Sequence, residues 1–194
     1  EGDNDGASVS AVQSIYLALI ISVPIMICGI FFSEYLLRLM GATNEVISEG
    51  SGYTRLTLGF NLIVILLFLI NGIFRGAGDA ALAMRSLWIA NSINIVLDPM
   101  LIFGIGPFPE LGIEGAAVAT IIGRSFGIIY QLYHLGKGKG LIKIHKDNWH
   151  FKPIIIWKLV KLSSGVTAQF IISSASWIFL MRIISTFGST ALAG

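Results

Sequence analysis

The sequence predicts an all-α fold, a polytopic membrane helical bundle with five spans, from its composition and its pattern of apolar segments. Hydrophobic residues make up 55% of the 194-residue chain and charged residues only 12%, whereas a soluble domain carries about 25% charged residues. The mean hydropathy is +0.81. Five apolar stretches are each long enough, at about 1.5 Å per residue, to cross about 30 Å of hydrocarbon. The single cysteine, Cys28, lies in one of them and excludes a disulfide framework within the chain.

The predicted spans are separated by connections of distinct composition. Pro24 lies inside the first span, where we expect it to bend the helix because it cannot donate a backbone hydrogen bond. The first connection, 33–53, begins with a segment that we expect to form a short helix at the membrane surface. A Gly-rich turn at 75–85 and a Pro-containing turn at 106–112 follow. The predicted spans are 9–32, 56–74, 86–105, 113–134 and 162–187.

The last connection, 136–161, is basic and sets the expected orientation. An excess of lysine marks the cytoplasmic side of a membrane protein, so we expect this connection in the cytoplasm and the chain in the cytoplasmic (inner) membrane. Alternation of the spans then places Arg75 and Arg85 inside and Glu110 and Glu114 outside. The lysines are expected to orient the chain and contact anionic lipid rather than bind nucleic acid. They are Lys137, Lys139, Lys143, Lys146, Lys152, Lys158 and Lys161.

A second surface helix is predicted near the end of that connection. Pro153 suits the first position of a helix because its missing N–H is not needed there. The segment 154–161 would then lie along the inner membrane surface, with Trp157 anchored among the lipid headgroups.

Polar residues interrupt the third predicted span, 86–105, along one face. Asn91, Asn94 and Asp98 are spaced by three and then four residues, which brings them to the same side of a helix. Asp98 is the only acidic residue away from the ends of a predicted span, and a carboxylate at that depth is costly unless it is neutral, paired or facing water. Pro99 frees a backbone carbonyl beside it. We therefore predict a functional site at Asp98, with a neutral Asp98 bonded to Asn94 as the structural alternative.

The fourth predicted span, 113–134, returns beside the third and supplies partners at matching depths. Counted from the turn that joins the two spans, Thr120 lies at the depth of Asp98. Arg124 lies at the depth of Asn94 by the same count. Because an arginine near the membrane centre needs a partner or water, we expect Arg124 to pair with Asp98 or with a carboxylate of another helix.

The fourth span also carries small residues at every fourth position. Such a stripe allows the backbone of another helix to approach closely. The stripe consists of Gly115, Ala119, Gly123 and Gly127.

Three stretches of the sequence together form a pattern that is specific enough to indicate a protein family. They are NGIFRGAGDA at 71–80, the N-x-x-x-D-P pattern of Asn94, Asp98 and Pro99, and GIEGAAVAT at 112–120. In these stretches the chain resembles the multidrug and toxic compound extrusion (MATE) family, and the resemblance extends over essentially the whole sequence.

The resemblance implies a fold of twelve helices in two lobes around a central cavity. Residues 1–135 resemble helices three to six of the first lobe, 136–161 the cytoplasmic linker between the lobes, and 162–194 the first helix of the second lobe. Because the sequence starts in a polar segment without an initiator methionine, we expect an internal fragment of a longer protein.

The resemblance also implies a secondary active antiporter that exports amphipathic or cationic drugs and toxic compounds in exchange for H⁺ or Na⁺. Asn94, Asp98 and Thr120 match positions that bind the coupling ion in the family. The resemblance therefore implies that these residues could be ligands of a sodium ion. We expect no other cofactor, and we expect a monomeric transporter whose partners are membrane lipid and the export substrate. The residues expected to support the site are Asn91, Pro99 and Arg124.

The fifth predicted span departs from part of the family. Some members carry a carboxylate in the corresponding helix, whereas this sequence has Gln169 and no acidic residue between 162 and 187. The chain therefore resembles the DinF-like branch more than the NorM-like branch, which puts an ion site in the second lobe in doubt.

Two alternatives remain open. A lipid-linked oligosaccharide flippase of the same superfamily would need several basic residues for pyrophosphate, and only Arg124 and Arg182 lie in predicted spans.

An intramembrane aspartyl protease could use the Gly-x-Gly-Asp string at 76–79 together with Asp98. Asp79 and Asp98 would lie about 28 Å apart along a helix axis, too far for two carboxylates that share one water. We therefore expect a transporter rather than an enzyme.

Overall fold

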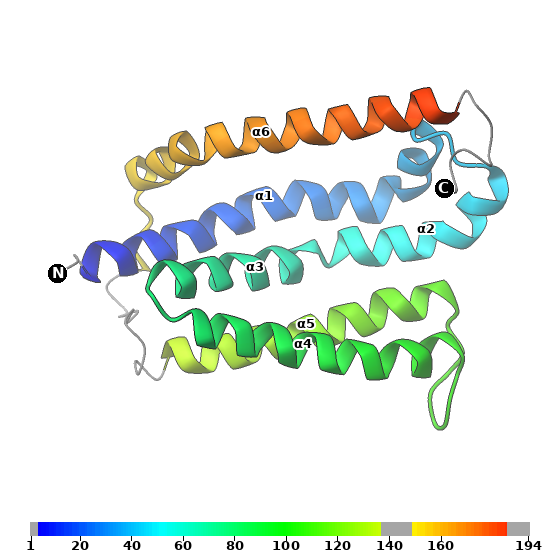
Figure 1. The fold of residues 1–194 in the computed structure, drawn as a ribbon, viewed down its shortest axis with the longest axis horizontal. Helices are drawn as coiled ribbons and strands as arrows, with labels where there is room; N and C mark the ends of the chain where they lie inside the picture. Colours follow the sequence, from blue (N-terminus) through cyan, green and yellow to red (C-terminus); the bar gives the residue numbers. More distant parts are fainter. Residues whose placement is uncertain (1–3, 137–148, 186–194) are drawn as a thin grey trace. The chain divides into compact units, whose positions relative to one another are not determined.

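The structure, a computed structural model, describes residues 4–136 and 149–185. The described residues form six α-helices and no strand (Figure 1). The helices are α1 (Asn4–Leu39), α2 (Asn44–Gly59), α3 (Asn61–Gly76), α4 (Ala80–Ile102), α5 (Ile113–Gly136) and α6 (Pro153–Ser185). Helices α1 to α5 belong to a first compact unit, 1–151, and α6 belongs to a second, 152–194. Four of the lysines expected to orient the chain lie outside the described residues: Lys137, Lys139, Lys143 and Lys146.

The membrane-spanning character predicted from the sequence is present in these helices. Within the described residues α1, α4, α5 and α6 are each long and apolar enough to cross a membrane. Helices α2 and α3 pass the same test as a pair and are bent by 46° where they meet. The described part of the chain thus holds four spans, or five if the bent pair counts as one.

The short helix predicted at the start of the connection 33–53 is present. A kink at Phe32 (φ −122°, ψ 17°) divides α1, and the part after the kink runs to Leu39. The rest of that connection was predicted wrongly, because most of it is the start of α2. Thr43 directly precedes α2, and its hydroxyl caps the helix by accepting a hydrogen bond from the Val46 N–H. Helix α2 contains many polar and small residues, so its sequence has no clear apolar pattern. Its contacts with α1 and α5 stabilise the helix.

The break between α2 and α3 lies at Phe60 and is fixed by the next residue. Phe60 has φ −105° and ψ 20°, outside helical geometry. Asn61 donates from Nδ2 to the Leu58 carbonyl at 2.6 Å and to the Ser22 carbonyl of α1 at 3.2 Å. Asn61 therefore satisfies a carbonyl exposed by the break and ties the break to α1.

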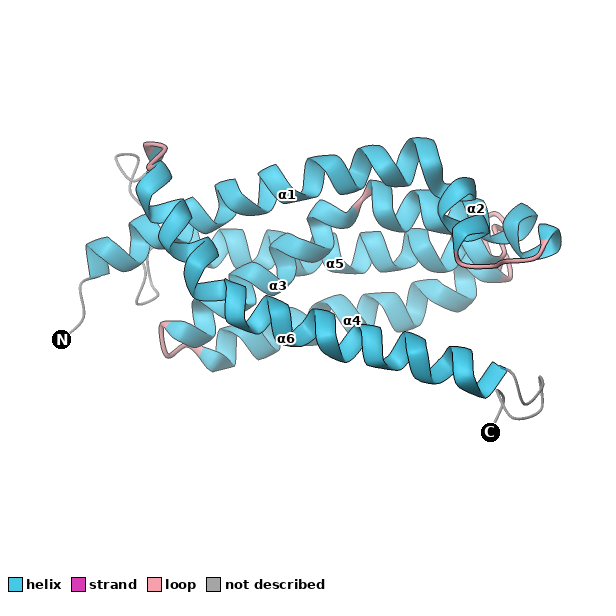
Figure 2. Cartoon of the chain, turned by 90° about the horizontal axis from the view of Figure 1, so that it is seen from above, coloured by secondary structure: helices cyan, strands magenta, loops and turns pink. Residues whose placement is uncertain are grey.

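In the first unit, α2 and α3 lie between α1 on one side and the α4–α5 pair on the other (Figures 1 and 2). Leu67 of α3, Ala90 of α4 and Ile128 of α5 form one buried cluster of this arrangement. A second buried cluster consists of Ile70, Phe74, Leu82, Ala83 and Leu135. Because lipid tails are as apolar as these side chains, close van der Waals packing rather than exclusion of water holds such an interface together.

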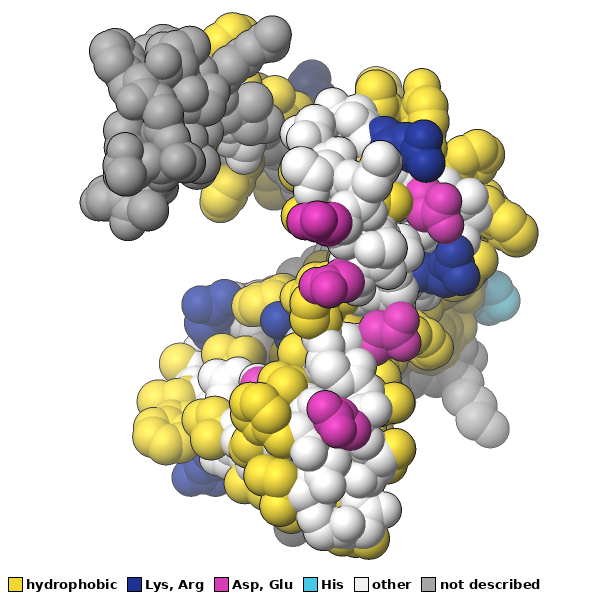
Figure 3. All heavy atoms as spheres, turned by 90° about the vertical axis from the view of Figure 1, so that its right-hand side faces the viewer, with side chains coloured by type: hydrophobic (Ala, Val, Ile, Leu, Met, Phe, Trp, Pro, Cys, Tyr) yellow, Lys and Arg dark blue, Asp and Glu magenta, His cyan; other side chains and the backbone are white. Residues whose placement is uncertain are grey.

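Exposed acidic side chains gather at one end of the described part of the first unit, whereas exposed arginines lie at both ends. Acidic side chains are exposed at the end where α2 and α5 begin (Figure 3), together with two arginines, Arg38 and Arg55. Arg75 and Arg85 are exposed beside the α3–α4 turn, at the opposite end. The exposed acids are Glu34, Glu45, Glu49, Glu110 and Glu114.

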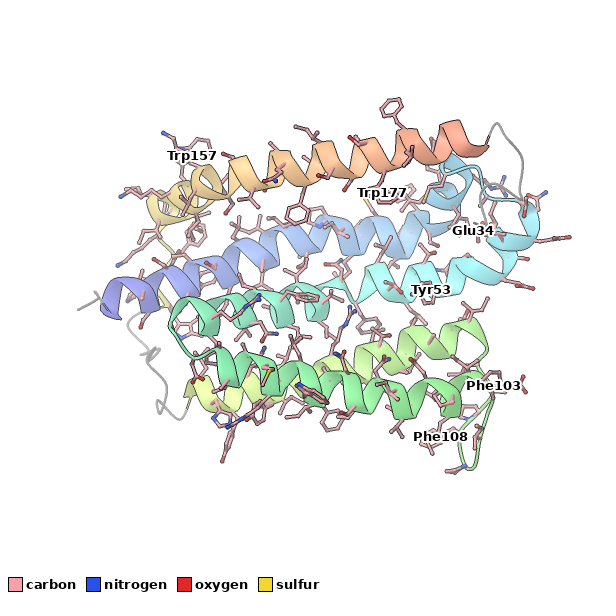
Figure 4. The ribbon with its side chains drawn as sticks, viewed as in Figure 1. Glu34, Tyr53, Phe103, Phe108, Trp157 and Trp177 are labelled. Carbon is pink, nitrogen blue, oxygen red and sulfur yellow. The ribbon has the colours of Figure 1, made fainter. Side chains whose placement is uncertain are left out.

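Helix α6 begins at Pro153, as predicted, but it is continuous to Ser185. The segment predicted as a separate surface helix at 154–161 is therefore the first part of α6, because no glycine or proline interrupts the helix between Pro153 and Gly165. Trp157 and Trp177 project from α6 (Figure 4) and are 70% and 66% exposed. Residues 186 and 187, the predicted end of this span, lie outside the described residues.

Candidate functional site

Helix α4 carries most of the predicted site residues, and its two ends are defined by local contacts. Asp79 caps its start by accepting a hydrogen bond from the Leu82 N–H at 3.1 Å. At its end the Phe103 N–H donates to the Pro99 carbonyl at 3.1 Å, and Gly104 follows with φ +65°. Phe103 and Phe108 lie at the turn that leads to α5 (Figure 4). Asp79 therefore serves as a helix cap.

Helix α5 lies directly against α4 because the turn between them folds back on the end of α4. The Leu111 N–H donates to the Leu101 carbonyl at 2.9 Å, and the Gly112 N–H donates to the Ile102 carbonyl at 3.2 Å. These hydrogen bonds fix the register of the two antiparallel helices before α5 begins.

The small-residue stripe of α5 lies against the backbone of another helix, as predicted, and that helix is α4. A Cβ atom at Gly115 would lie 2.5 Å from the Leu101 carbonyl oxygen, and one at Gly123 would lie 2.5 Å from the Ala90 carbonyl oxygen. Ala119 is fully buried. Any side chain at these two glycines would separate the helices, so the stripe sets how closely α4 and α5 approach.

Asn94, Asp98 and Thr120, here called the Asn94 cluster, come together across this interface. Asn94 Nδ2 donates a hydrogen bond to Asp98 Oδ1 at 3.0 Å, along α4. The same nitrogen donates to Thr120 Oγ1 on α5 at 3.2 Å. All three side chains are half-buried. One amide thus connects the carboxylate of one helix to the hydroxyl of the next.

The register differs in detail from the one that the sequence predicted. Thr120 was expected at the depth of Asp98, but its hydrogen bond goes to Asn94, one turn away on α4. The prediction counted from residue 105, whereas α4 ends at Ile102. The two helices are offset from the expected register by about three residues, just under one turn, because the turn between them contains more residues than the apolar pattern indicated.

The predicted supporting residues lie around the cluster without joining its hydrogen bonds. Arg124 is half-buried on α5, and among the described residues no ion pair links it to Asp98 or to another carboxylate. Asn91 is exposed and lines a shallow groove on α4 with Trp88 and Ile95. Pro99 lies within α4, next to the carboxylate.

The Asn94 cluster places the Asp98 carboxylate and the Thr120 hydroxyl beside the amide nitrogen of Asn94, between two membrane-spanning helices. Carboxylate and hydroxyl oxygens suit a small cation, and a carboxylate suits a proton. Because the Asn94 nitrogen faces both of these oxygens, the Asn94 oxygen could join them only after the amide is reversed. A bound sodium ion would also need water or oxygens from elsewhere.

A second group of polar residues, Asn71, Ser86 and Gln131, was missed by sequence reasoning. Ser86 Oγ lies 3.0 Å from Asn71 Oδ1, and Gln131 Nε2 donates to Ser86 Oγ at 2.9 Å. We call these residues the Gln131 cluster; it joins α3, α4 and α5 at the end where α4 begins. An uncharged polar side chain in each of three successive spans indicates such a cluster, but attention to charged residues alone does not reveal it.

Comparisons with known proteins agree with this architecture. A family model described as MatE matches residues 1–100. A probable multidrug resistance protein of Bacillus subtilis, YoeA, is 29% identical over 177 residues, which are 90% of this chain and 38% of that protein. A FAD transporter of Shewanella oneidensis is 34% identical over 120 residues, which are 62% of this chain and 26% of that protein.

A solved structure of similar fold adds to these relatives. A MOP superfamily transporter from Pyrococcus furiosus superposes with a TM-score of 0.87 at 30% identity. The match covers 98% of this chain and 42% of that chain. The chain therefore spans well under half the length of the proteins that it resembles.

Proposed function

Since the chain belongs to the MATE family of multidrug transporters, we propose that it forms part of a secondary antiporter that exports an amphipathic or cationic compound in exchange for H⁺ or Na⁺. In this proposal residues 1–135 belong to the first lobe, 136–161 is the cytoplasmic linker between the lobes, and 162–194 starts the second lobe. The protein would reside in the cytoplasmic membrane and act as a monomer.

One observation carries the proposal: the Asn94 amide connects Asp98 of α4 to Thr120 of α5 inside the membrane-spanning part of the chain. A carboxylate within a membrane span is costly and is by default functional. Transporters build ion sites inside the membrane where polar side chains meet irregular helix segments. Asp98 lies within α4, four residues before the helix ends at Ile102, with Asn94 beside it and Pro99 directly after it.

The hydrogen bonds suggest how ion binding would act on the protein. An anionic Asp98 accepts a strong, charge-assisted hydrogen bond from Asn94. A proton or a sodium ion would neutralise the carboxylate and weaken that hydrogen bond. It would thereby also change the hydrogen bond that Asn94 donates to Thr120. Because Asn94 contacts both helices, neutralisation at one residue changes the contact between α4 and α5. Pro99, which makes no backbone hydrogen bond at its own nitrogen, would allow α4 to adjust locally.

The nature of the export substrate is also part of the proposal. Relatives that match this chain are named for multidrug resistance and for FAD transport, which supports a small organic compound as the export substrate. Acidic side chains at the end where α2 and α5 begin would favour cationic compounds there. The lack of an acidic residue in α6 favours the DinF-like branch, with the coupling ion in the first lobe.

The test is gradient-driven efflux from proteoliposomes that contain the full-length transporter. Asp98→Asn keeps the size and polarity of the side chain but removes the charge, so it should fold normally and lose efflux driven by a proton or sodium gradient. Asp79→Asn is the matched control, because asparagine caps a helix as well as aspartate does. Normal gradient-driven efflux by folded Asp98→Asn would refute the proposal.

A further inference from the structure

The Gln131 cluster holds two polar atoms that have no hydrogen-bond partner among the described residues. They are Asn71 Nδ2, a donor on α3, and Gln131 Oε1, an acceptor on α5. Asn71 is 1% exposed, and Ser86 and Gln131 are 0% exposed. An unpaired buried polar group costs about 1–3 kcal/mol, and it costs more in a membrane than at a surface where water can reach it.

The orientation of the Gln131 amide is fixed by its neighbours. Gln131 Nε2 lies 3.3 Å from the Leu67 carbonyl oxygen, which can only accept a hydrogen bond. Reversing the amide would bring its oxygen against that carbonyl. Gln131 Nε2 therefore remains toward Leu67 and Ser86, and Gln131 Oε1 remains the atom that needs a donor.

The orientation of the Asn71 amide is not fixed in this way. Ser86 Oγ lies 3.0 Å from Asn71 Oδ1 and 2.7 Å from the Ala83 carbonyl oxygen, but a hydroxyl has one proton to donate. If that proton goes to Ala83, the reversed amide donates from Asn71 Nδ2 to Ser86 Oγ instead. The atom of Asn71 that needs a partner is then its oxygen rather than its nitrogen.

The ligand must therefore donate to Gln131 Oε1 and, at Asn71, either accept from the nitrogen or donate to the oxygen. Water satisfies both cases, because it can donate two hydrogen bonds and accept two. A cation would have no carboxylate within the cluster to neutralise it and would meet the Gln131 amide protons. An anion would meet the oxygen of Gln131. We propose that the Gln131 cluster binds one buried water molecule that joins Asn71 of α3 to Gln131 of α5.

This hydration site is separate from the Asn94 cluster. Ser86 and Asn94 lie on the same face of α4, about 12 Å apart along its axis. Between them Ala90 is 1% exposed and lies where Cβ atoms at Gly123 and Gly127 would collide with α4. The water would thus be a fixed structural component that holds three helices together, and a dry, tightly packed contact would separate it from the proposed ion site.

The direct test is a structure of the full-length transporter at a resolution that shows ordered water. We expect a density peak within about 3.2 Å of both the Gln131 amide oxygen and one amide atom of Asn71. A direct hydrogen bond between the two amides, or a side chain from another helix that satisfies both atoms, would overturn the proposal.

A thermal double-mutant cycle tests the same point by measuring whether Asn71 and Gln131 depend on each other. Both contact Ser86, so the cycle of Asn71→Leu and Gln131→Met is measured in a Ser86→Ala background of the full-length protein. A bridging water predicts that the two shifts in melting temperature remain non-additive there, because either substitution removes the same water. Additive shifts would mean that Ser86 alone connects the two amides. Ser125→Ala, which removes a hydroxyl bonded within α5 to the Ile121 carbonyl, is the control background.

Discussion

At the scale of single residues, the Asn94 amide determines what Asp98 and Thr120 can do together. The sequence was sufficient to group these residues, because a lone carboxylate in an apolar span and polar residues three and four positions apart are visible without a structure. It was insufficient to show that Thr120 contacts Asn94 rather than Asp98. It also predicted a supporting role for Asn91, which is exposed outside the cluster.

Removing the Asn94 amide should weaken the site without abolishing it. Asn94→Ala removes a hydrogen bond to a charged carboxylate, worth about 1.5 kcal/mol, and should therefore raise the ion concentration needed for half-maximal efflux by about tenfold. Efflux of the full-length transporter in proteoliposomes, measured against the ion concentration, checks this. Asn91→Ala should behave like the parent, and an equal effect of the two substitutions would contradict the assigned geometry.

At the scale of helices, the interface of α4 and α5 was the best predicted and the break between α2 and α3 the worst. Glycines at every fourth position reveal a close helix contact directly. The exact register depends on a turn with positive φ at Gly104, Gly106 and Gly112, and hydropathy contains no information on such turns. The polar sequence of α2 resembles that of a loop. The helix forms because its cap and its tertiary contacts stabilise it, and neither is visible in a hydropathy pattern.

The glycine stripe makes a prediction for folding. Gly123→Leu should strongly lower the yield of folded full-length protein, because even a Cβ atom there would lie 2.5 Å from the Ala90 carbonyl oxygen. Ile122→Leu, a change of shape at the adjacent position, should leave the yield unchanged. Size-exclusion chromatography of a fluorescent fusion measures both. A monodisperse, transport-competent Gly123→Leu protein would show that α4 and α5 do not need this close contact.

The break between α2 and α3 makes a second prediction for stability. Asn61→Ala removes the hydrogen bonds to the Ser22 and Leu58 carbonyls and should destabilise the protein by about 1–2 kcal/mol. The melting temperature of the purified full-length protein should fall, whereas that of the exposed control Asn91→Ala should not. An unchanged melting temperature for Asn61→Ala would mean that packing alone holds the break.

At the scale of the whole molecule, the proposed orientation in the membrane rests on the distribution of charge. The composition was sufficient to predict a helical membrane protein, and the motifs were sufficient to predict the family. The separation of Arg75 and Arg85 from Glu110 and Glu114 onto opposite ends is present in the structure. Which end faces the cytoplasm rests on the lysine-rich connection, most of which lies outside the described residues.

Single cysteines at Gly138 and Gly106, in a Cys28→Ser background, test that orientation. A membrane-impermeant thiol reagent should label position 106 in intact cells and position 138 only after the membrane is permeabilised, because lysine-rich connections remain in the cytoplasm. Labelling of both positions in intact cells would contradict the assigned topology.

The central claim is that Asp98 binds the coupling ion, and it is tested most directly by the linkage between ion and substrate binding. Substrate affinity of the purified full-length transporter is measured at two proton and two sodium concentrations, for the parent and for Asp98→Asn. If ion and substrate are coupled through Asp98, the parent's affinity should change by about tenfold with one of the two ions. Asp98→Asn should bind substrate with an affinity that is independent of that ion. An Asp98→Asn protein whose affinity keeps the ion dependence of the parent would contradict the account.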